Sequence, residues 1–434
     1  MRVLVTGAYG FIGQHIAVGL ARAGHEVVAY GRDLALGRRL LPGFEWQFCD
    51  FNKDTDEAIW LPRLAGVEAV VNCIGILQST AQDTHQHAHV DGPIALFGAA
   101  QKVGVRRVVQ ISALGAEAEA GTDYSASKSV GDDFLKSLDI DWVVLKPSLV
   151  YGRGSFGGTT LLRSLAGLPG VAPLVDGGRH AFQPVFMDDL VASVVRLVEP
   201  DAPSRIEIAI TGPVPKTTRE IAVLMRRWLG FPDAHVLNIP AWLAKPMLLL
   251  GDMAGWFGLP TAFRSSSLRQ MELGNTANCD AAVAATGVVP RPMEVALADN
   301  PSTLQDRLHA RSAIAVALLR IAIGLFWVAT GVISLLPSVN LVAAGFVGAT
   351  GLDEYASRLL VTTAGIADIT LGLPFLAGWR VRLFGSLQIA LTLAYLVVLS
   401  IWLPAMWLDP FGALMKAVPL VFATLVVMAW AERR

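Results

Sequence analysis

The sequence is poor in cysteine and has no excess of charge of either sign. Its 434 residues include three cysteines, Cys49, Cys73 and Cys279. They are too few and too scattered for a disulfide framework or a zinc site, which fits a reducing compartment. The 35 lysines and arginines nearly balance the 36 aspartates and glutamates, so no large basic field favours nucleic acid. We therefore expect neither a disulfide scaffold nor a nucleic-acid partner.

The N-terminus lacks the pattern of a signal peptide, because no basic segment precedes an apolar one there. The chain begins instead with a short apolar run, Arg2 to Thr6. Apolar residues make up 53% of the sequence, a high share for a soluble protein, and the excess lies after Arg311. This distribution predicts a cytosolic part followed by a membrane part.

The first 33 residues have the pattern of a strand, a glycine turn, a helix and a second strand. Arg2–Thr6 is apolar and β-branched, as in a buried parallel strand, and it leads into Gly7-Ala-Tyr-Gly10-Phe-Ile-Gly13. Apolar residues at helical spacing predict a helix from Gln14 to Ala23, and Glu26–Tyr30 has the composition of a strand. This is the βαβ context in which the glycine pattern indicates a dinucleotide site.

The glycine pattern also predicts how a nucleotide is held. Gly7 would make the tight turn, Gly10 would let the backbone approach a pyrophosphate, and Gly13 would let the helix pack closely on the strand. We expect cofactor contacts in this loop and after later strands, at Gly7, Tyr9, Gly10, Phe11, Ile12, Gly13, Arg32, Asp50, Cys73, Gly75, Lys128, Pro147 and Val150.

The end of the second strand, Gly31-Arg32-Asp33, bears on the choice of cofactor. An acidic residue here would accept from the ribose 2′-hydroxyl of NAD, whereas an arginine can pair with the 2′-phosphate of NADP. Arg32 therefore predicts NADP(H), with NAD as the alternative. Arg38 and Arg39 could extend a phosphate site, although a solvated helix face is the explanation that we favour for both.

Three histidines, His85, His87 and His89, open a later helix. His85 and His89 are four residues apart and would share a helix face, as metal ligands often do. No nearby cysteine or convincing third ligand accompanies them, so we expect surface or helix-start histidines and no metal site.

A tyrosine and a lysine with acid–base potential follow the fifth expected strand, Arg107–Ile111, which stops at Ser112. In Tyr124-Ser-Ala-Ser-Lys128 the two side chains are four residues apart and would share one helix face. An unperturbed phenol titrates near pH 10, so proton transfer near neutrality needs such a cationic neighbour.

With these residues the chain resembles the short-chain dehydrogenase/reductase superfamily, whose serine, tyrosine and lysine are matched by Ser112, Tyr124 and Lys128. The resemblance implies that Tyr124 exchanges a proton with the substrate oxygen. It also implies that Lys128 lowers the pKa of that tyrosine and holds the nicotinamide ribose, while Ser112 orients the carbonyl. Over roughly the first 300 residues the chain is most similar to the atypical branch that contains the nucleotide-binding accessory subunit of mitochondrial complex I.

The expected architecture is α/β, a Rossmann-type doubly wound parallel sheet over residues 1–200 with a small substrate lobe and linker over 201–310. Further strands are expected near residues 48–50, 67–75 and 141–152. In the lobe, Thr217–Leu229 has the periodicity of an amphipathic helix.

Residues 311–434 are expected to form an all-α bundle of four transmembrane helices. Four apolar runs, near 312–336, 356–377, 383–403 and 414–430, each approach the roughly 20 residues that span a bilayer. Basic residues flank them on one side, including Arg311, Arg380, Arg433 and Arg434, which predicts that both ends face the cytosol. We expect a bacterial inner-membrane protein.

The segment Trp407-Leu-Asp-Pro-Phe-Gly-Ala-Leu-Met-Lys416 before the last run, together with the four-helix pattern, is similar to the DoxX-like membrane module. Some relatives of that module serve quinone-linked electron transfer. The alternative is an anchor that holds a reductase near a lipophilic substrate.

Two charges fall inside the apolar runs, Arg320 in the first and Asp368 in the second. Counted from the cytosolic ends, they lie roughly 12 and 16 Å deep at 1.5 Å per residue. Since isolated charges in a bilayer are costly, we expect the two to pair. The alternative is an arginine that reaches the headgroups and a protonated aspartate.

The function that these patterns favour is a membrane-attached NAD(P)H-dependent oxidoreductase acting on a small, lipophilic carbonyl or quinone-related substrate. Two alternatives remain: an NADPH-binding scaffold or assembly factor with a respiratory or quinone-linked partner protein, and a nucleotide-sugar epimerase or dehydratase.

Overall fold

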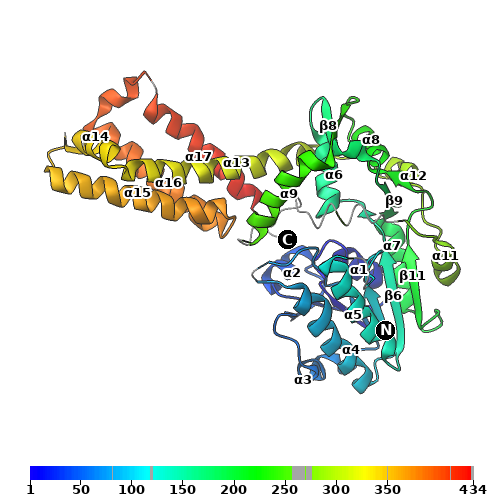
Figure 1. The fold of residues 1–434 in the computed structure, drawn as a ribbon. Helices are drawn as coiled ribbons and strands as arrows, with labels where there is room; N and C mark the ends of the chain where they lie inside the picture. The colour runs from blue at the N-terminus through cyan, green and yellow to red at the C-terminus, as the bar shows by residue number, and fades with distance from the viewer. Residues whose placement is uncertain are drawn as a thin grey trace. The chain divides into compact units, whose positions relative to one another are not determined.

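The computed structural model describes residues 1–80, 82–117, 121–256, 269, 276–348, 350–410 and 412–431. The chain divides into two compact units, Met1–Ala310 and Arg311–Arg433 (Figure 1). The predicted fold, a Rossmann-type parallel sheet followed by apolar helices, is confirmed.

The first unit is built on a sheet of seven strands in the order β11-β6-β5-β4-β1-β2-β3, all paired in parallel. The strand order reverses beside β1, which pairs with β2 on one side and with β4 on the other. Ligands of open α/β sheets bind outside the carboxyl ends of the strands at such a point. The strands are β1 (Arg2–Thr6), β2 (Glu26–Gly31), β3 (Glu45–Phe48), β4 (Ala69–Asn72), β5 (Arg107–Ile111), β6 (Asp141–Pro147) and β11 (Ile206–Ile210).

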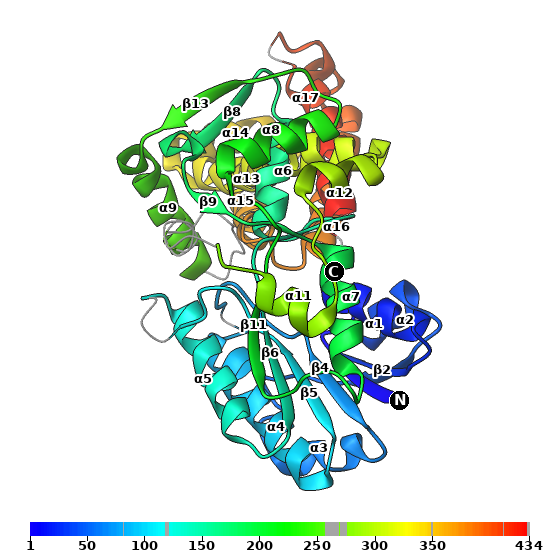
Figure 2. The same ribbon diagram turned by 90° about the vertical axis from the view of Figure 1, so that its right-hand side faces the viewer.

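Helices cover both faces of this sheet because alternate strand residues point to opposite sides. Val3 and Val5 belong to the core under α1 and α7, whereas Leu4 belongs to the core under α4 and α5. Figure 2 shows the two groups of helices on either side of the sheet. The helices are α1 (Gly13–Arg22), α2 (Leu34–Leu40), α3 (Glu57–Trp60), α4 (Gly92–Val103), α5 (Asp123–Ser137) and α7 (Met187–Val198).

Two expected boundaries were wrong. The third strand ends at Phe48 rather than running through Asp50, because the Asp50 carbonyl accepts from the N–H of Asp54 at 2.8 Å and closes a turn there. The sheet also does not end with residue 200, since β11 (Ile206–Ile210) pairs with β6 along its length.

Most of the remaining elements of the first unit form a small lobe whose core contains Tyr151, Leu162, Phe182, Ile221 and Met225. Helix α11 instead packs on α7 and β11, with Ala282 in the core under α1 and α7. The expected amphipathic helix is α8 (Thr218–Trp228), and Thr217 and Glu220 form a capping box that fixes its start. The other elements are β7 (Val150–Tyr151), α6 (Gly158–Gly167), β8 (Val171–Val175), β9 (Ala181–Phe182), β10 (Val185–Phe186), β12 (Lys216–Thr217), β13 (His235–Ile239), α9 (Ala241–Trp256), α11 (Asp280–Thr286) and α12 (Met293–Asp299).

The second unit consists of apolar helices. In the described part of the chain, three helices are long and apolar enough to cross a membrane: α13 (Leu304–Leu335), α15 (Glu354–Leu376) and α16 (Val381–Trp402). The fourth expected run forms the shorter α17 (Ala413–Trp430), and a helix that we did not expect, α14 (Pro337–Gly348), follows α13. Arg433 and Arg434, which we used to orient the module, lie outside the described residues.

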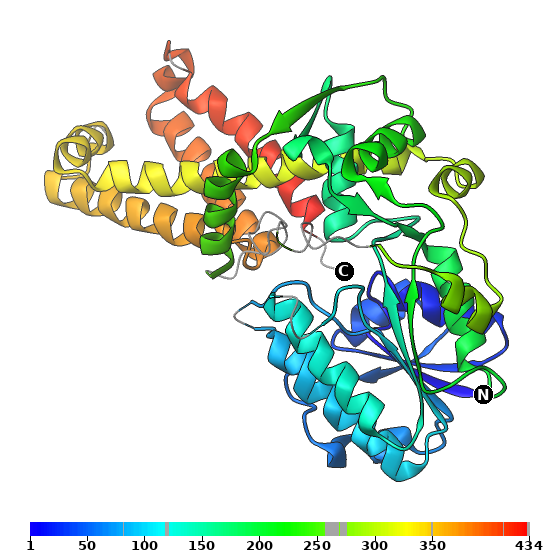
Figure 3. The ribbon, with the colours of Figure 1, turned by 45° about the vertical axis from the view of Figure 1, so that its right-hand side comes forward.

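Helices α13 and α15 run side by side (Figure 3), and glycines set how closely they approach. A Cβ added to Gly331 would lie 2.5 Å from the Gly365 carbonyl oxygen, and one added to Gly372 would lie 2.9 Å from the Val328 nitrogen. Small residues that let backbones meet are a common basis of helix association in membranes.

The expected pairing of Arg320 with Asp368 was wrong. Among the described residues, the Asp368 carboxylate accepts from the Tyr395 hydroxyl of α16 at 3.5 Å, and no ion pair with Arg320 is recorded. The Arg320 guanidinium instead lies against Gly378, at the turn between α15 and α16. Similar depths along two helices do not fix which faces meet, and here α16 supplies the partner.

This arrangement predicts energetic coupling between Asp368 and Tyr395 and none between Asp368 and Arg320. Asp368→Leu combined with Tyr395→Phe should deviate from additivity by about 0.5–1 kcal/mol, the usual size of a hydrogen bond between membrane helices. Asp368→Leu combined with Arg320→Leu should be additive. Unfolding of the full chain in detergent measures both cycles, and coupling of the Arg320 pair alone would contradict this assignment.

Candidate functional site

The loop after β1 is shaped by its glycines. Gly7 has a φ of 62°, a region that L side chains rarely adopt. Its carbonyl accepts from the Gly10 N–H at 2.8 Å, which closes the turn. A Cβ on Gly13 would overlap this carbonyl oxygen and lie 2.9 Å from its carbon. Glycine at both positions therefore lets α1 begin directly against the loop, with its N–H groups at the carboxyl edge of the sheet.

The other residues expected to contact a cofactor follow the carboxyl ends of neighbouring strands. Cys73 and Gly75 come after β4, and Pro147 and Val150 lie at the end of β6 and in β7. Backbone N–H groups after β4 are held by β1 and β4 side chains: that of Cys73 donates to the Thr6 hydroxyl and that of Ile74 to the Asn72 amide oxygen. Burial raises the pKa of the Cys73 thiol to about 12, so it is not a thiolate nucleophile near neutrality.

Phe11, Ile12 and Tyr9 complete the glycine loop. The Phe11 carbonyl hydrogen-bonds the His15 ring nitrogen Nδ1 at 2.8 Å, and Ile12 is the N-cap residue of α1. The Tyr9 ring lies over Gly31, whose added Cβ would be 2.8 Å from ring carbon Cδ1. Its hydroxyl accepts from the backbone N–H groups of Arg32 and Asp33, both at 3.2 Å. Tyr9 thus connects the loop after β1 to the loop after β2 by hydrogen bonds.

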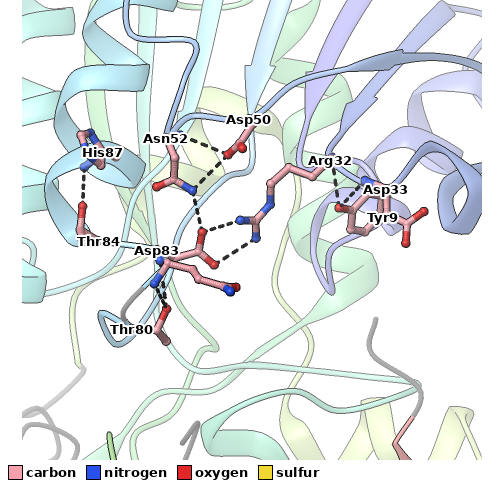
Figure 4. A network of polar contacts seen from close by, with 10 residues as sticks. Tyr9, Arg32, Asp33, Asp50, Asn52, Thr80, Asp83, Thr84 and His87 are labelled. Atoms are coloured by element: carbon pink, nitrogen blue, oxygen red, sulfur yellow. Dashed lines mark hydrogen bonds and ion pairs between the residues drawn. The ribbon is translucent and has the colours of Figure 1, made fainter. Parts of the chain in front are cut away.

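Arg32 lies at the end of β2, as expected, and its guanidinium is already paired. It donates to both oxygens of Asp83, 51 residues further along the chain (Figure 4). Asn52 donates to Asp83 and to Asp50. The Asp33 carboxylate caps α2 by accepting from the Leu36 N–H at 2.9 Å, so that oxygen is engaged within its own turn.

Helix α5 carries Tyr124 and Lys128 on one face, as their spacing predicts. The Lys128 ammonium donates to the Ile111 carbonyl at 3.1 Å. It also lies 3.2 Å from the position of a Cβ on Gly75, so it reaches the turn after β4. Burial lowers the pKa of Lys128, although the charge of the nearby Asp132 carboxylate acts in the opposite direction. Lys128 therefore joins α5 to the ends of β4 and β5.

Among the described residues, no hydrogen bond joins the Ser112 and Tyr124 hydroxyls. The Ser112 hydroxyl donates to the Asp132 carboxylate, which is also on α5 and is 1% exposed. Burial and the Asp132 charge raise the pKa of Tyr124, whereas we expected Lys128 to lower it. The reason is that the Lys128 ammonium is held at the Ile111 carbonyl, and burial dominates at the phenol.

The histidines lie against Tyr124. His85 and His89 stack with ring centroids 5.3 Å apart, and His89 meets the Tyr124 ring edge-on at 5.5 Å. The segment Gln86–Asp91 is a π-helix, a rare form that is frequent at functional sites. His89 Nε2 accepts from the Ile76 N–H at 3.1 Å, so Nδ1 carries the proton that faces Ser127. Of the two expectations, surface or helix-start histidines, the first was wrong for His89, which is 2% exposed, whereas the second fits its place in the helical segment that leads into α4.

The sequence carried a signal for Asp132, which we missed. It follows Lys128 by four residues and Tyr124 by eight, so it extends the same helix face. Asp83 had no comparable signal, because its partner Arg32 is 51 residues away in the sequence.

Comparison with known proteins relates the two parts of the chain to two families. Residues 3–209 match the NAD dependent epimerase/dehydratase family, and residues 324–425 match the DoxX-like family. The first match supports a nicotinamide cofactor, and the second, with the long apolar helices, supports a membrane protein.

Among individual proteins, the chain is 24% identical over 261 residues to the mitochondrial 40 kDa subunit of NADH-ubiquinone oxidoreductase of Neurospora crassa, covering 59% of this chain and 68% of that one. It is 27% identical over 203 residues to the ceramide reductase of Caulobacter vibrioides, covering 44% and 59%. The chain thus spans about three fifths to two thirds of the length of these relatives. The Bordetella bronchiseptica enzyme WbmH, solved with NAD⁺, shares the fold with a TM-score of 0.52 at 18% identity, over 68% of this chain and 95% of that one.

The close approach at Gly13 predicts that Gly13→Ala destabilises the first unit by about 1–3 kcal/mol, because the methyl group would overlap backbone that cannot rotate away. Nucleotide affinity should fall as well, since the loop must shift. Thermal unfolding and cofactor titration measure the two effects. Gly43→Ala is the matched control, because a Cβ there meets nothing within 4 Å; equal effects of both variants would contradict the packing argument.

His89 predicts a pH dependence of stability. Burial lowers its pKa to about 2, whereas an unfolded histidine titrates near 6.5. Below pH 6.5 the unfolded chain therefore binds a proton that the folded chain does not, and stability falls as the pH falls. From pH 7.5 to 5.0 the wild type should lose about 2 kcal/mol more than His89→Gln. His87→Gln, whose side chain is 41% exposed, should follow the wild type; identical curves for all three proteins would refute the assignment.

Proposed function

We propose that this chain is a membrane-attached NAD(P)H-dependent oxidoreductase of the short-chain dehydrogenase/reductase type, acting on a lipophilic carbonyl or quinone-related substrate. The family match over residues 3–209 and the sequence relation to a reductase support an enzyme of this chemistry. The substrate class rests on the apolar helices of the second unit, which would bring the first unit to a bilayer where such molecules gather.

The observation that carries the proposal is the placement of α5. Its Lys128 ammonium reaches the turn at Gly75, after β4. Tyr124, one helical turn away, packs against His89, whose ring accepts from the Ile76 N–H after β4. The glycine loop of Gly7 and Gly13 stands at the same edge, after β1. A proton donor, a cation and a nucleotide cradle at one sheet edge are the parts that hydride transfer to a carbonyl needs.

A nicotinamide dinucleotide fits the residues present. The loop after β1 is a cradle that a Cβ would fill at Gly10, 3.0 Å from the Gly7 carbonyl oxygen, and at Gly13. The α1 N-terminus beyond it favours an anion. When bound there, the nicotinamide would supply or accept the hydride. Arg32 is the group that would favour the 2′-phosphate of NADP(H).

In this mechanism Tyr124 exchanges a proton with the substrate oxygen, and Lys128, whose ammonium lies at the Ile111 carbonyl, would hold the nicotinamide ribose. Ser112 would orient the carbonyl. Burial raises the pKa of Tyr124, so the phenol is protonated near neutrality. Because a raised pKa weakens a proton donor, this mechanism requires that bound cofactor and substrate lower the pKa of Tyr124 before it protonates the oxygen. The Asp132 carboxylate accepts a hydrogen bond from the Ser112 hydroxyl. Its negative charge also raises the pKa of Lys128, against the effect of burial, and so favours the charged ammonium.

A second candidate function is a nucleotide-binding scaffold for a respiratory or quinone-linked complex. It is favoured by the relation to a complex I subunit and by the Ser112 hydroxyl, which is directed to Asp132 rather than to Tyr124. An epimerase or dehydratase could use the same residues and would give no net cofactor oxidation.

We propose that the chain lies in a bacterial inner membrane with the first unit and both ends in the cytosol.

The experiment that tests the enzyme is Tyr124→Phe. With a substrate found by screening carbonyls, quinones and lipid extracts for NAD(P)H oxidation, the variant should lose about a hundredfold to ten-thousandfold in turnover, the usual size of a proton-transfer contribution. Nucleotide affinity should change little, since the phenol does not build the phosphate site.

Tyr355→Phe is the matched control, because this tyrosine is 79% exposed in the second unit. A wild-type chain that binds nucleotide but oxidises none in such a screen would favour the scaffold. Substrate conversion without net cofactor oxidation would favour the epimerase.

A further inference from the structure

The Arg32 guanidinium is engaged in a way that bears on cofactor choice. It presents both terminal nitrogens to one carboxylate, with Nη2 3.1 Å from Asp83 Oδ2 and Nη1 bonded to Oδ1. A planar fork of two parallel N–H donors is also how arginine binds a phosphate. The donors that would recognise a ribose 2′-phosphate are therefore the donors that Asp83 uses (Figure 4).

Other groups hold Asp83 in this position. The Asn52 amide donates to its Oδ1 at 2.8 Å, and its backbone N–H donates to the Thr80 hydroxyl at 3.0 Å. The side chain is 25% exposed, against 49% for Arg32. Besides Arg32, the carboxylate is thus held by Asn52, and the Asp83 backbone is held by Thr80, unlike a flexible surface partner.

The carboxylates around Arg32 also disfavour the binding of a further anion beside it. The Asp83 and Asp50 carboxylates both act on Arg32 and hold its pKa above the usual value. A 2′-phosphate would bring further negative charge to a place where one guanidinium already faces two carboxylates. A ribose 2′-hydroxyl brings none and can accept or donate a hydrogen bond without displacing Asp83.

We propose that Asp83 is a specificity-determining residue that competes internally for Arg32: a ribose 2′-phosphate binds only when the Asp83 carboxylate leaves the guanidinium. Asp83 thereby lowers the affinity for NADPH without affecting NADH, and it sets how far Arg32 can favour the phosphorylated cofactor. This inference rests on the nucleotide site of the proposed function, and it assigns a role to a residue 51 positions from its partner.

The test is titration of NADPH and NADH into the full chain in detergent, for the wild type, Asp83→Asn, Arg32→Ala and the double variant. Asp83→Asn should tighten NADPH binding by about tenfold, the size expected when a charged hydrogen-bonding competitor is removed. NADH affinity should change by less than about twofold. In the Arg32→Ala background, the gain from Asp83→Asn should disappear.

Asp139→Asn is the matched control for net charge, because Asp139 forms another exposed ion pair, with Arg205, and it should leave both affinities unchanged. Asp83→Ser provides the same test should the asparagine variant unfold. A gain for both cofactors alike, no gain, or a gain that persists without Arg32 would overturn the competition while leaving the nucleotide site intact. Binding of neither cofactor by any variant would overturn the nucleotide site itself.

Discussion

The pairing of β1 with β2 on one side and β4 on the other is the constraint on which the candidate site depends. Because the strands are parallel and in register, Thr6, Tyr30 and Asn72 end side by side. The loops that follow them must therefore emerge at one edge. A buried polar chain reinforces this: the Thr6 hydroxyl donates to Asn72, and the Asn72 amide donates to Gln110 on β5 at 2.7 Å. Satisfied buried polar groups of this kind fix one register, since a slip would leave each of them without a partner.

Local pattern predicted the parts of the site that local geometry determines. The glycine spacing gave the turn after β1, and the four-residue interval gave the shared face of Tyr124 and Lys128. Strands β1 and β5 have the expected bounds because each is a short β-branched run. These features need only a few neighbouring residues.

The features that were missed depend on contacts across the chain. Asp83 meets Arg32, and Ser112 turns to Asp132, because the fold brings those groups together. In the second unit, helical depth alone suggested Arg320 as the partner of Asp368, but the rotation of α16 presents Tyr395. Which face a helix shows to its neighbour follows from packing, as with the glycines between α13 and α15, and one sequence does not reveal it.

Because Gln86–Asp91 is a π-helix, the geometry of the segment before α4 depends on the number of its residues more than on their identity. A π turn holds about one more residue than an α turn. Deleting one residue between Thr84 and Gly92 would let the ladder relax to α geometry and turn everything before it by about 100° around the helix axis. The His85 ring would then leave the His89 ring on which it stacks. Substitutions at the positions between the two histidines leave this register unchanged, so the stack constrains the number of residues in the segment more than the identity of those between its rings.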